Sequence, residues 1–538
     1  MQYFEMIKKF IPETNIYVFA LISLIAPLFI TKLISLYNNN IQQGNGILEE
    51  DTSVLSNNLS NNISTINKAI GVSHDIVTRE FVIGKENIEA AIIFTKGLVD
   101  INVINNNILE PLMLDIFEWT IDIDISPFNH LKNSLPISEI YEESCINNIT
   151  SKILKGETAL LFHNYDKAFI LKTCDTKARN QEEPTTELLV RGPRIGFNEN
   201  IMDNIALLRK AGVNTDLRFL SYQVGKRFKK ELVITYLNGI ANEEIVDNVI
   251  NKIKTITIDN LPESGYVEEL IEENNFSLFP QVQSTERPDR VIAALSEGRV
   301  GILLDGTPFV LIVPVTINMF LQSPEDYYER WIPSSLIRML RYVASFIAIF
   351  TPALYISFVS FHQGLIPTKL AISIISSREG VPFPILIEAL LMEVSIEILR
   401  EAGLRLPKPI GQTIGIVGGL VIGDAAVQAG IVSPVTVIVV ALTAISSFSL
   451  PQYNFSISLR ILRFIAMFLA ATFGLYGVII FFLFFSIHLV RLNSFGVPYL
   501  SPAVPYQLGD WKDLFIRLPL SAMKKRPKII KPNDTIRK

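Results

Sequence analysis

The sequence predicts a soluble amino-terminal domain of the α/β or α+β class, then an α-helical membrane domain with several spans, then a short basic tail. The mean hydropathy is positive, +0.34, although 19% of the residues are charged. Charged residues concentrate before residue 341 and after residue 490, and a strongly apolar tract lies between them. Helical and strand periods alternate in the first part, which indicates a mixed domain. We therefore expect an apolar segment with a linker, a soluble domain of two subdomains, a membrane domain and a cytoplasmic tail, at residues 1–52, 53–333, 334–490 and 491–538.

The amino-terminal segment contains its own apolar stretch. Thr14 to Thr31 are eighteen uncharged residues between Glu13 and Lys32, and about 20 apolar residues are needed to cross a bilayer. Pro27 and the polar flanks also suit a helix that lies at the membrane surface, so both interpretations stay open. The Asn-rich stretch that follows is too polar to form a packed core, and we interpret it as a linker.

Two pairs of apolar runs in the soluble domain predict β-hairpins. Thr158–His163 and Ala168–Lys172 flank a short polar sequence, which is typical of a hairpin turn. Arg299–Leu304 and Pro308–Val313 are separated by Asp305-Gly306, a pair that tolerates the positive φ angles of a tight turn. The short length of these runs argues against a membrane span.

A strand and two helices are expected around the second hairpin. Leu232–Leu237 is rich in Val, Ile, Thr and Tyr, which favours a strand. Pro288 suits the first turn of a helix that Gly298 ends. Between them, the apolar residues of one segment fall on one face of an amphipathic helix: Ile245, Val246, Val249, Ile250 and Ile253.

Two long uncharged stretches are expected to cross the membrane. Tyr342–Phe361 has twenty residues without a formal charge and follows Arg338 and Arg341. Because basic residues beside a span tend to stay in the cytoplasm, its start is placed inside. Phe464–Ile487 has twenty-four uncharged residues and is the clearest span.

The number of spans depends on shorter segments. The stretch 409–459 carries one formal charge, Asp424, and a Gly-Ile-Val-Ser-Pro break at 430–434 divides it into two spans. Asp424 is a candidate pore residue, although nearby glycines also suit close helix packing. If the segments 366–376 and 383–402 both cross, there are six spans, and if both are re-entrant there are four. Either count puts the soluble domain and the basic tail on the same, cytoplasmic side.

The segment 383–402 has the length of a span but carries several charges. Glu388 falls on one side, and the others gather within about 100° of the opposite helix face: Glu393, Glu397, Arg400 and Glu401. A charge at the bilayer centre costs about 3 kcal/mol or more, so this face must meet protein or water. One interpretation pairs Arg400 with Glu397 and Glu393 on an interfacial or re-entrant helix. The other is a ring of glutamates from several subunits along a cation path.

Two arginines flank a rigid turn in the soluble domain. Arg191 and Arg194 enclose Gly192-Pro193, so both guanidinium groups could project from one loop. Guanidinium groups bind carboxylates at two points, and the nearby candidate partners are Glu182, Glu183 and Glu187. Three interpretations stay open: an ion-paired turn within the domain, a subunit or gating contact, and a ligand site.

Several functional classes lack support in the sequence. The net charge of −5 does not point to nucleic acid as a partner. The five His are scattered without ligand spacing, and the two Cys lie far apart, so we expect no metal site. Neither phosphate-binding glycine loops nor a catalytic set of residues is found, so we expect no cofactor and no enzymatic activity.

Strings of unusual residues give the chain a family resemblance. It resembles the A subunit of GerA-type spore germination (germinant) receptors over about residues 60 to 530, in Glu182–Glu187, Val190–Arg194, Thr285–Arg290, Asp305–Phe309, Ser323–Arg330, Arg378–Pro384, Glu388–Glu393, Pro407–Gln412 and Ser494–Pro502. The apolar amino-terminal segment departs from the family pattern, which usually starts with a polar stretch.

The resemblance implies a subunit in the inner membrane of bacterial spores. It implies a B subunit, a transporter-like protein that senses the nutrient, and a C subunit, a lipoprotein. Several copies of the A subunit would form a homo-oligomer, a nutrient-gated ion conduit whose opening starts ion release. The nutrient itself cannot be named, because the resemblance places its pocket in another subunit.

Three functional hypotheses follow. In the first, the chain forms or helps to form an oligomeric cation channel. In the second, it is a scaffold that relays the signal while another protein conducts. In the third, it is a secondary transporter that works alone, but the matching halves that this would favour are not found in the sequence.

Overall fold

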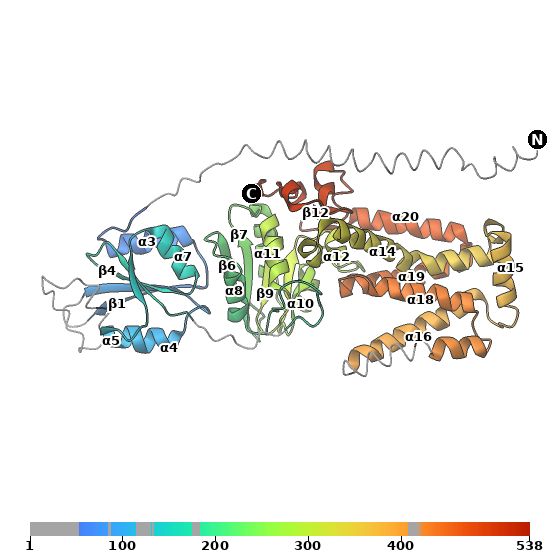
Figure 1. The fold of residues 1–538 in the computed structure, drawn as a ribbon, viewed down its shortest axis with the longest axis horizontal. Helices are drawn as coiled ribbons and strands as arrows, with labels where there is room; N and C mark the ends of the chain where they lie inside the picture. Colours follow the sequence, from blue (N-terminus) through green and yellow to red (C-terminus); the bar gives the residue numbers. More distant parts are fainter. Residues whose placement is uncertain are drawn as a thin grey trace, which may run out of the picture. The chain divides into compact units, whose positions relative to one another are not determined.

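The computed structural model describes residues 53–83, 88–113, 131, 134–174, 183–406, 419 and 421–537. The expected helix at 14–31 and Glu182 therefore lie outside the described residues. Among those described, two sheets with their covering helices extend to Val313, and the chain then becomes helical (Figure 1).

The first sheet has five antiparallel strands in the order β1-β2-β4-β5-β3. Successive residues of a strand point to opposite faces, so Ile92 packs on one side of the sheet and Ile93 on the other. Helices α3 and α7 cover the Ile93 face, and α4, η1 and α5 cover the Ile92 face. The elements are α3 (Leu59–Ile70), β1 (Ile76–Ile83), β2 (Ile88–Thr95), α4 (Ile101–Val103), the π-helix η1 (Ile104–Leu109), α5 (Glu110–Met113), β3 (Ile140–Glu143), α7 (Ile146–Leu154), β4 (Thr158–Phe162) and β5 (Ala168–Leu171).

The second sheet repeats this topology. Its antiparallel order, β6-β7-β9-β10-β8, is the order of the first sheet counted from its own first strand. Helices α9 and α10 cover one face, and α8 and α11 cover the other. The elements are α8 (Ile201–Lys210), β6 (Leu217–Val224), β7 (Lys230–Leu237), α9 (Glu243–Lys254), α10 (Ser264–Ile271), β8 (Gln283–Thr285), α11 (Pro288–Glu297), β9 (Val300–Leu304) and β10 (Val310–Val313).

The local predictions for this region are confirmed. Strands β4 and β5 pair as a hairpin, as do β9 and β10, with Gly306 at a φ of 84° between the latter two. The expected helix after β7 is α9, which buries its apolar face. Pro288 begins α11, and Gly298 ends it in the left-handed conformation. Because the pairing is antiparallel throughout both sheets, the α+β alternative is the correct one.

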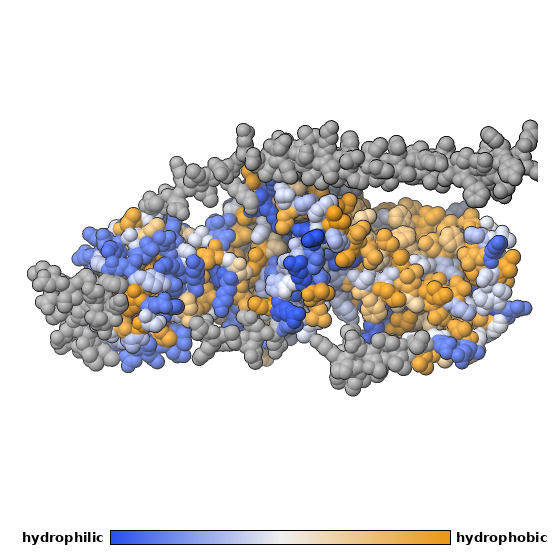
Figure 2. All heavy atoms as spheres, viewed as in Figure 1, coloured by the Kyte–Doolittle hydropathy of each residue, from blue (hydrophilic) through white to orange (hydrophobic). Residues whose placement is uncertain are grey.

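The helical region follows the second sheet. Two of its helices, α14 and α19, are long and apolar enough to cross a membrane, and three shorter helices are also apolar. Figure 2 shows apolar residues concentrated over this region. The elements are α12 (Ile317–Leu321), α13 (Glu325–Tyr328), α14 (Trp331–Ser360), η2 (Gln363–Leu365), α15 (Thr368–Ser377), α16 (Ile385–Arg405), α18 (Pro434–Phe448), α19 (Tyr453–Phe473) and α20 (Leu475–Arg491).

Two of the span predictions need correction. The single span at Phe464–Ile487 is wrong, because α19 ends at Phe473 and α20 begins at Leu475. Gly474 between them has a φ of 60°, a value that glycine adopts without strain. The first span begins earlier than Tyr342, since α14 starts at Trp331 and contains Arg338 and Arg341. Both errors arise because hydropathy reports where apolar residues lie and not where a helix begins or turns.

The carboxyl-terminal segment folds back onto the second sheet. After α20, the short strands β11 (Asn493–Ser494) and β12 (Val497–Pro498) form a two-stranded ribbon. Ser494 Oγ accepts a hydrogen bond from Val315 N and donates one to Gln281 O. Three short 3₁₀ helices follow: η3 (Leu508–Asp513), η4 (Leu520–Ala522) and η5 (Lys528–Ile530). Phe495, Val497 and Ile530 join the core beneath α9 and α10.

Candidate functional site

Glu393 of α16 lies in the interior of the helical region against an arginine of α19. Its Oε2 is 2.9 Å from Arg463 Nη2, and both side chains are buried. The contact is an ion pair without hydrogen-bond alignment. Among the described residues, no group donates a hydrogen bond to either carboxylate oxygen of Glu393, and the Arg463 Nε and Nη1 atoms have no acceptor.

Glu397, one turn further along α16, is only partly enclosed. Its carboxylate lies 3.2 Å from Arg400 Nη1 and 3.5 Å from Arg460 Nε, and its side chain is 38% exposed. Arg400 also donates to Ser447 Oγ and lies over the ring of Phe448 at the end of α18. Glu397 therefore joins α16 to α19, and Arg400 joins α16 to α18.

Glu388 occupies a separate, well-satisfied site on the opposite side of α16. Arg378 donates to its Oε1 at 2.8 and 3.1 Å. Its Oε2 accepts from Ser433 N at 2.9 Å and Thr436 Oγ1 at 3.0 Å, at the beginning of α18. A carboxylate is stabilised at this end of a helix by the backbone N–H groups and the helix dipole.

The other two acidic candidates are exposed. Glu401 pairs with Arg405 at 2.6 Å within α16, and Asp424 accepts from Gln428 Nε2 at 2.7 Å. Neither forms a hydrogen bond or an ion pair with Glu393 or Glu397 in the part of the chain that the structure describes. In the same part, no group of His, Cys, Asp and Glu side chains is placed to hold a metal ion.

The arginines of α19 were missed by the sequence reasoning. Arg460 and Arg463 lie just before the longest uncharged run, so hydropathy placed them outside a span, whereas both are inside α19 and buried. Their spacing of three residues was the available signal, since residues i and i+3 share a helix face. With Arg378 and Arg400, they give four arginines to three glutamates, Glu388, Glu393 and Glu397.

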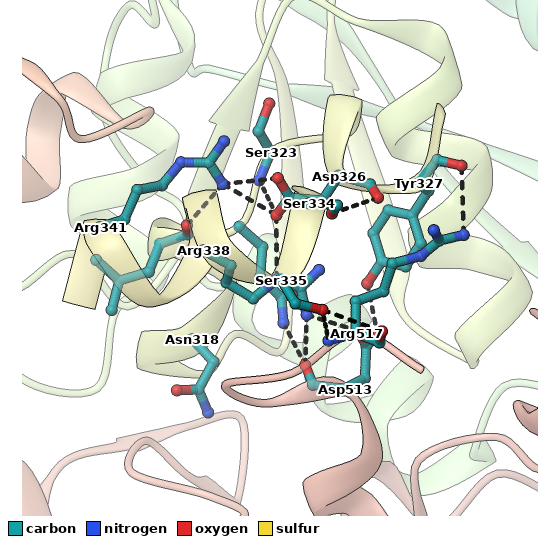
Figure 3. Close-up of polar contacts among 12 residues, drawn as sticks. Asn318, Ser323, Asp326, Tyr327, Ser334, Ser335, Arg338, Arg341, Asp513 and Arg517 are labelled. Carbon is teal, nitrogen blue, oxygen red and sulfur yellow. Dashed lines mark hydrogen bonds and ion pairs between the residues drawn. The ribbon is translucent and has the colours of Figure 1, made fainter. Parts of the chain in front are cut away.

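A second buried network joins the beginning of α14 to the soluble region and the carboxyl-terminal segment (Figure 3). Asp326 accepts from Arg338 Nε at 3.1 Å and from Arg341 Nη1 at 2.8 Å. Asp513 accepts from Arg338 Nη1 at 2.7 Å and from the Tyr327 hydroxyl at 2.6 Å. Burial raises the pKa of Tyr327, and the nearby Asp513 carboxylate raises it further.

The arginines of this network were predicted only as topology signals beside a span. The structure shows instead that Arg338 is completely buried and Arg341 nearly so. Arg517 adds a further tie, because its backbone N–H donates to Ser335 Oγ and its guanidinium donates to Glu329 O. The first turns of α14 are thus fixed from two sides, by α13 and by the carboxyl-terminal segment.

The candidate loop at 183–194 shows one of the expected ion pairs, Arg194 with Glu183, whereas Arg191 and Glu187 have other partners. Arg194 lies 3.4 Å from Glu183, and Arg191 lies 3.9 Å from Glu329, both at exposed positions. Glu187 contacts neither arginine of the loop. Its carboxylate instead accepts from Arg290 Nη1 at 2.9 Å, and also from Thr285 Oγ1.

Glu187 also connects the loop to the helical region. Its Oε1 accepts from Gln452 Nε2 at 2.5 Å, and Gln452 is the residue before α19. Glu286 and Arg287, which lie just before α11, hold the backbone of the loop, because Glu286 accepts from Thr185 N and Arg287 donates to Pro193 O. The soluble region is therefore tied to the same helix that carries Arg460 and Arg463.

The fold is that of a protein with two sheet-containing regions followed by apolar helices, two of which are long and apolar enough to cross a membrane. The chain matches the family described as "GerA: Bacillus/Clostridium GerA spore germination protein" over residues 64–529, and it belongs to this family. It is 44% identical over 486 residues to "Spore germination protein B1" of Bacillus subtilis (strain 168), which covers 90% of this chain and 99% of the relative. It is 51% identical over 383 residues to "Spore germination protein A1" of the same organism, which covers 71% of this chain and 79% of the relative.

A solved structure also matches. It is described as the crystal structure of the N-terminal domain of the A subunit of the Bacillus megaterium spore germinant receptor GerK3. It is 31% identical to this chain with a TM-score of 0.39, and it covers 49% of this chain and 98% of the solved chain. The family match over residues 64–529 and the curated relatives confirm, at the level of the family, the resemblance read from the sequence motifs.

Proposed function

We propose that this chain is the A subunit of a germinant receptor and that several copies form a nutrient-gated cation channel. One observation carries the proposal: a group of buried atoms from charged side chains lies among apolar helices without hydrogen-bond partners in the described chain. It comprises both carboxylate oxygens of Glu393 and the Nε atoms of Arg400, Arg460 and Arg463. Buried polar groups are nearly always bonded to protein or water, so this group favours a hydrated path.

The helical region is proposed to lie in the membrane. Helix α19 has 21 residues, which at 1.5 Å per residue span about 31 Å, close to the roughly 30 Å of a bilayer core. Arg463 is the eleventh residue of α19, so its pair with Glu393 would lie near mid-depth. A charge there cannot face lipid, and the 38% exposure of Glu397 requires a second copy or water beside α16.

The arrangement in the structure suits a closed conduit. Each of Glu388, Glu393 and Glu397 has an arginine beside it, and four arginines outnumber these three glutamates. The cluster as it stands would therefore repel cations. Opening requires α16 and α19 to separate, which would release Glu393 from Arg463 and expose its carboxylate to the path.

The contacts between the soluble region and the apolar helices supply a route for the signal. The soluble region is fixed to α14 through Asp326 and to the beginning of α19 through Glu187 and Gln452. A rearrangement of the soluble region therefore acts directly on the helix that carries Arg463. Because an interface held by discrete ion pairs switches between arrangements rather than deforming smoothly, this geometry supports gating.

The cellular arrangement is part of the proposal. The carboxyl-terminal segment contacts the second sheet, so the soluble region and the tail share one side of the membrane. Basic residues are concentrated in that tail, which favours the cytoplasmic side, here the spore core at the inner membrane. We include a nutrient-sensing B subunit and a lipoprotein C subunit as partners and assign the chain no catalytic step.

A second candidate is a relay scaffold, with another protein conducting the ions. It is favoured by Glu388, whose two oxygens are both satisfied within the chain. A carboxylate of this kind fixes helices and does not attract ions. If Glu393 and Glu397 act in the same way, the charged cluster holds the helices together and no ion path runs along it.

The test is the paired substitution Glu393→Gln with Glu397→Gln. In spores that carry the variant as their responding receptor, nutrient-triggered potassium release should slow at least about tenfold, since removal of a charge from a selective path costs at least ~1.4 kcal/mol. The matched control is Glu401→Gln, which neutralises an exposed carboxylate on the same helix.

Protein abundance and ion selectivity decide between the candidates. Membrane abundance is measured by immunoblot, and the purified chain is recorded in a planar bilayer. A shift in cation over anion preference in the paired variant supports the channel. Unchanged potassium release at normal abundance contradicts the channel and moves the function to the relay.

A further inference from the structure

The loop between α10 and β8 presents a phenylalanine to the outside. The side chain of Phe276 is 100% exposed, the full exposure that such a side chain can have. Three further apolar side chains near it along the chain are exposed as well: Tyr266, Leu270 and Leu278. Single exposed apolar residues are ordinary, but four on one short segment indicate a surface that something covers.

This exposure does not come from a loose loop. Gln281 Oε1 accepts from the backbone N–H groups of Glu273 and Asn274, both at 3.2 Å. Gln281 Nε2 donates to Asn274 O at 2.8 Å, and Asn274 Oδ1 accepts from Phe276 N at 3.1 Å. The backbone on either side of Phe276 is therefore fixed in a conformation that holds its ring outward.

The same loop is fixed to the ends of two apolar helices. Ser458 of α19 donates to Leu278 O, and Ser277 Oγ lies 3.1 Å from His488 Nε2 of α20. Phe279 packs against Phe455 of α19 with ring centroids 5.8 Å apart. Ser458 is the sixth residue of α19 and His488 is three residues from the end of α20. The loop thus lies within about 5–8 Å of these helix ends along their axes.

We propose that this loop is an interfacial membrane anchor, in which Phe276 inserts between lipid headgroups and the outer part of the acyl chains. The inference rests on the proposed insertion of α19 and α20. Since α19 matches the hydrocarbon core in length, its first turns lie at the boundary of the bilayer, where aromatic side chains are enriched. Exposed Ile487 and Val490, on either side of His488, continue the apolar surface along α20.

The charges around the loop indicate whether apolar burial or electrostatic attraction would hold it at the membrane. Glu268, Glu269 and Glu272 line a cavity of about 330 Å³ beside Leu278 and Ser458. Carboxylates do not attract anionic headgroups, so insertion depends on burial of the apolar side chains. The anchor should therefore work on neutral lipid, unlike a basic surface that needs anionic lipid.

The experiment places one fluorescent thiol probe at a time on the full chain, with Cys145 and Cys174 replaced by Ser. The probe sites are Phe276→Cys, Val72→Cys beside the first sheet, where the side chain is 84% exposed, and Phe484→Cys on the exposed face of α20. Each labelled protein is reconstituted in phosphatidylcholine vesicles containing lipids with a nitroxide quencher either near the headgroup or deep in the chain.

We expect at least a twofold loss of fluorescence at position 276 with the shallow quencher and little with the deep one. Position 484 should respond to the deep quencher and position 72 to neither. Addition of phosphatidylglycerol should leave the signal at 276 unchanged. Quenching at 484 without quenching at 276 overturns the anchor while the insertion of α20 stands, and absence of quenching at 484 overturns the insertion itself.

A second copy or partner subunit on the loop gives a different result. The probe at 276 would then be shielded from iodide in the water while lipid quenchers fail to reach it. That outcome also contradicts the anchor, since a protein contact and not lipid would cover Phe276.

Discussion

At the scale of single residues, the buried charges of this chain differ in how well they are satisfied. Glu388 receives four hydrogen bonds, from Arg378, Ser433 and Thr436. Glu393 has a charged neighbour but no aligned donor among the described residues. The first arrangement suits a structural support, and the second suits the release from Arg463 that we propose for Glu393. This difference separates two glutamates that the sequence distinguishes only by the face of the helix on which they lie.

A residue-scale prediction concerns Glu268 of α10. Burial raises its pKa from 4.5 to about 8, and the nearby carboxylates of Glu272 and Glu263 contribute. The folded chain therefore binds a proton that the unfolded chain releases, so stability should fall as pH rises from about 4.5 to 8. Glu268→Gln removes this titration and should flatten that part of the fall.

The measurement is the thermal unfolding midpoint of the full chain in detergent, at about pH 5 and about pH 9. Glu269→Gln, at the neighbouring exposed position, is the control. A fall in midpoint between the two pH values that is the same in wild type and in Glu268→Gln would show that Glu268 is ionised in the folded chain.

At the scale of elements, helices α19 and α20 approach each other closely after the turn at Gly474. A Cβ atom on Gly477 would lie 2.0 Å from Leu469 O, a backbone atom of the facing helix. Only glycine allows this approach between the two helices.

We predict that Gly477→Ala forces α19 and α20 apart. Overpacking of this kind costs about 1–3 kcal/mol, so the unfolding midpoint in detergent should fall and nutrient-triggered ion release should change. Gly364→Ala is the control, because nothing lies within 4 Å of a Cβ atom there. Equal unfolding midpoints for the two variants would show that α19 and α20 can separate without loss of stability.

The elements differ in how well the sequence predicts them. Hairpins and amphipathic helices, such as β9–β10 and α9, follow from patterns that act over a few residues. The division of Phe464–Ile487 into two helices does not, because both halves are equally apolar and only the turn at Gly474 separates them. The pairing of Glu393 with Arg463 brings together residues seventy positions apart, and no local pattern carries such a contact. The repeated strand order could not be predicted from the sequence either, because the two sheets share their topology without sharing a recognisable pattern of side chains.

At the scale of the whole molecule, the carboxyl-terminal segment joins the parts. It contacts the second sheet through Ser494 and Ile530 and the beginning of α14 through Asp513 and Arg517. Basic composition alone suggested a simple tail, and nothing in its charge indicated that Asp513 completes a buried network. Removal of one partner from such a network leaves the other charge buried and costs about 3–5 kcal/mol.

We predict that a chain ending at Pro505 loses the coupling between the soluble region and α14. Arg338 would keep Asp326 but lose Asp513, and the core beneath α9 would lose Ile530. The soluble region should become several-fold more sensitive to limited proteolysis, and nutrient-triggered ion release should fail. A chain that lacks only residues 536–538 is the control. Wild-type resistance in the shorter chain would contradict the role of this segment.

The place of Phe495, Val497 and Ile530 has a consequence for biosynthesis. The ribosome makes the second sheet first, then every apolar helix, and only then the three side chains that fill the last gap beneath α9 and α10. In the proposed topology, assembly of this core would therefore finish after insertion of the helices, and a chain whose helices were inserted wrongly would deliver its final residues to the other side of the membrane. The core would then lack these three side chains and would remain open to cellular proteases. Only a correctly inserted chain would complete its fold.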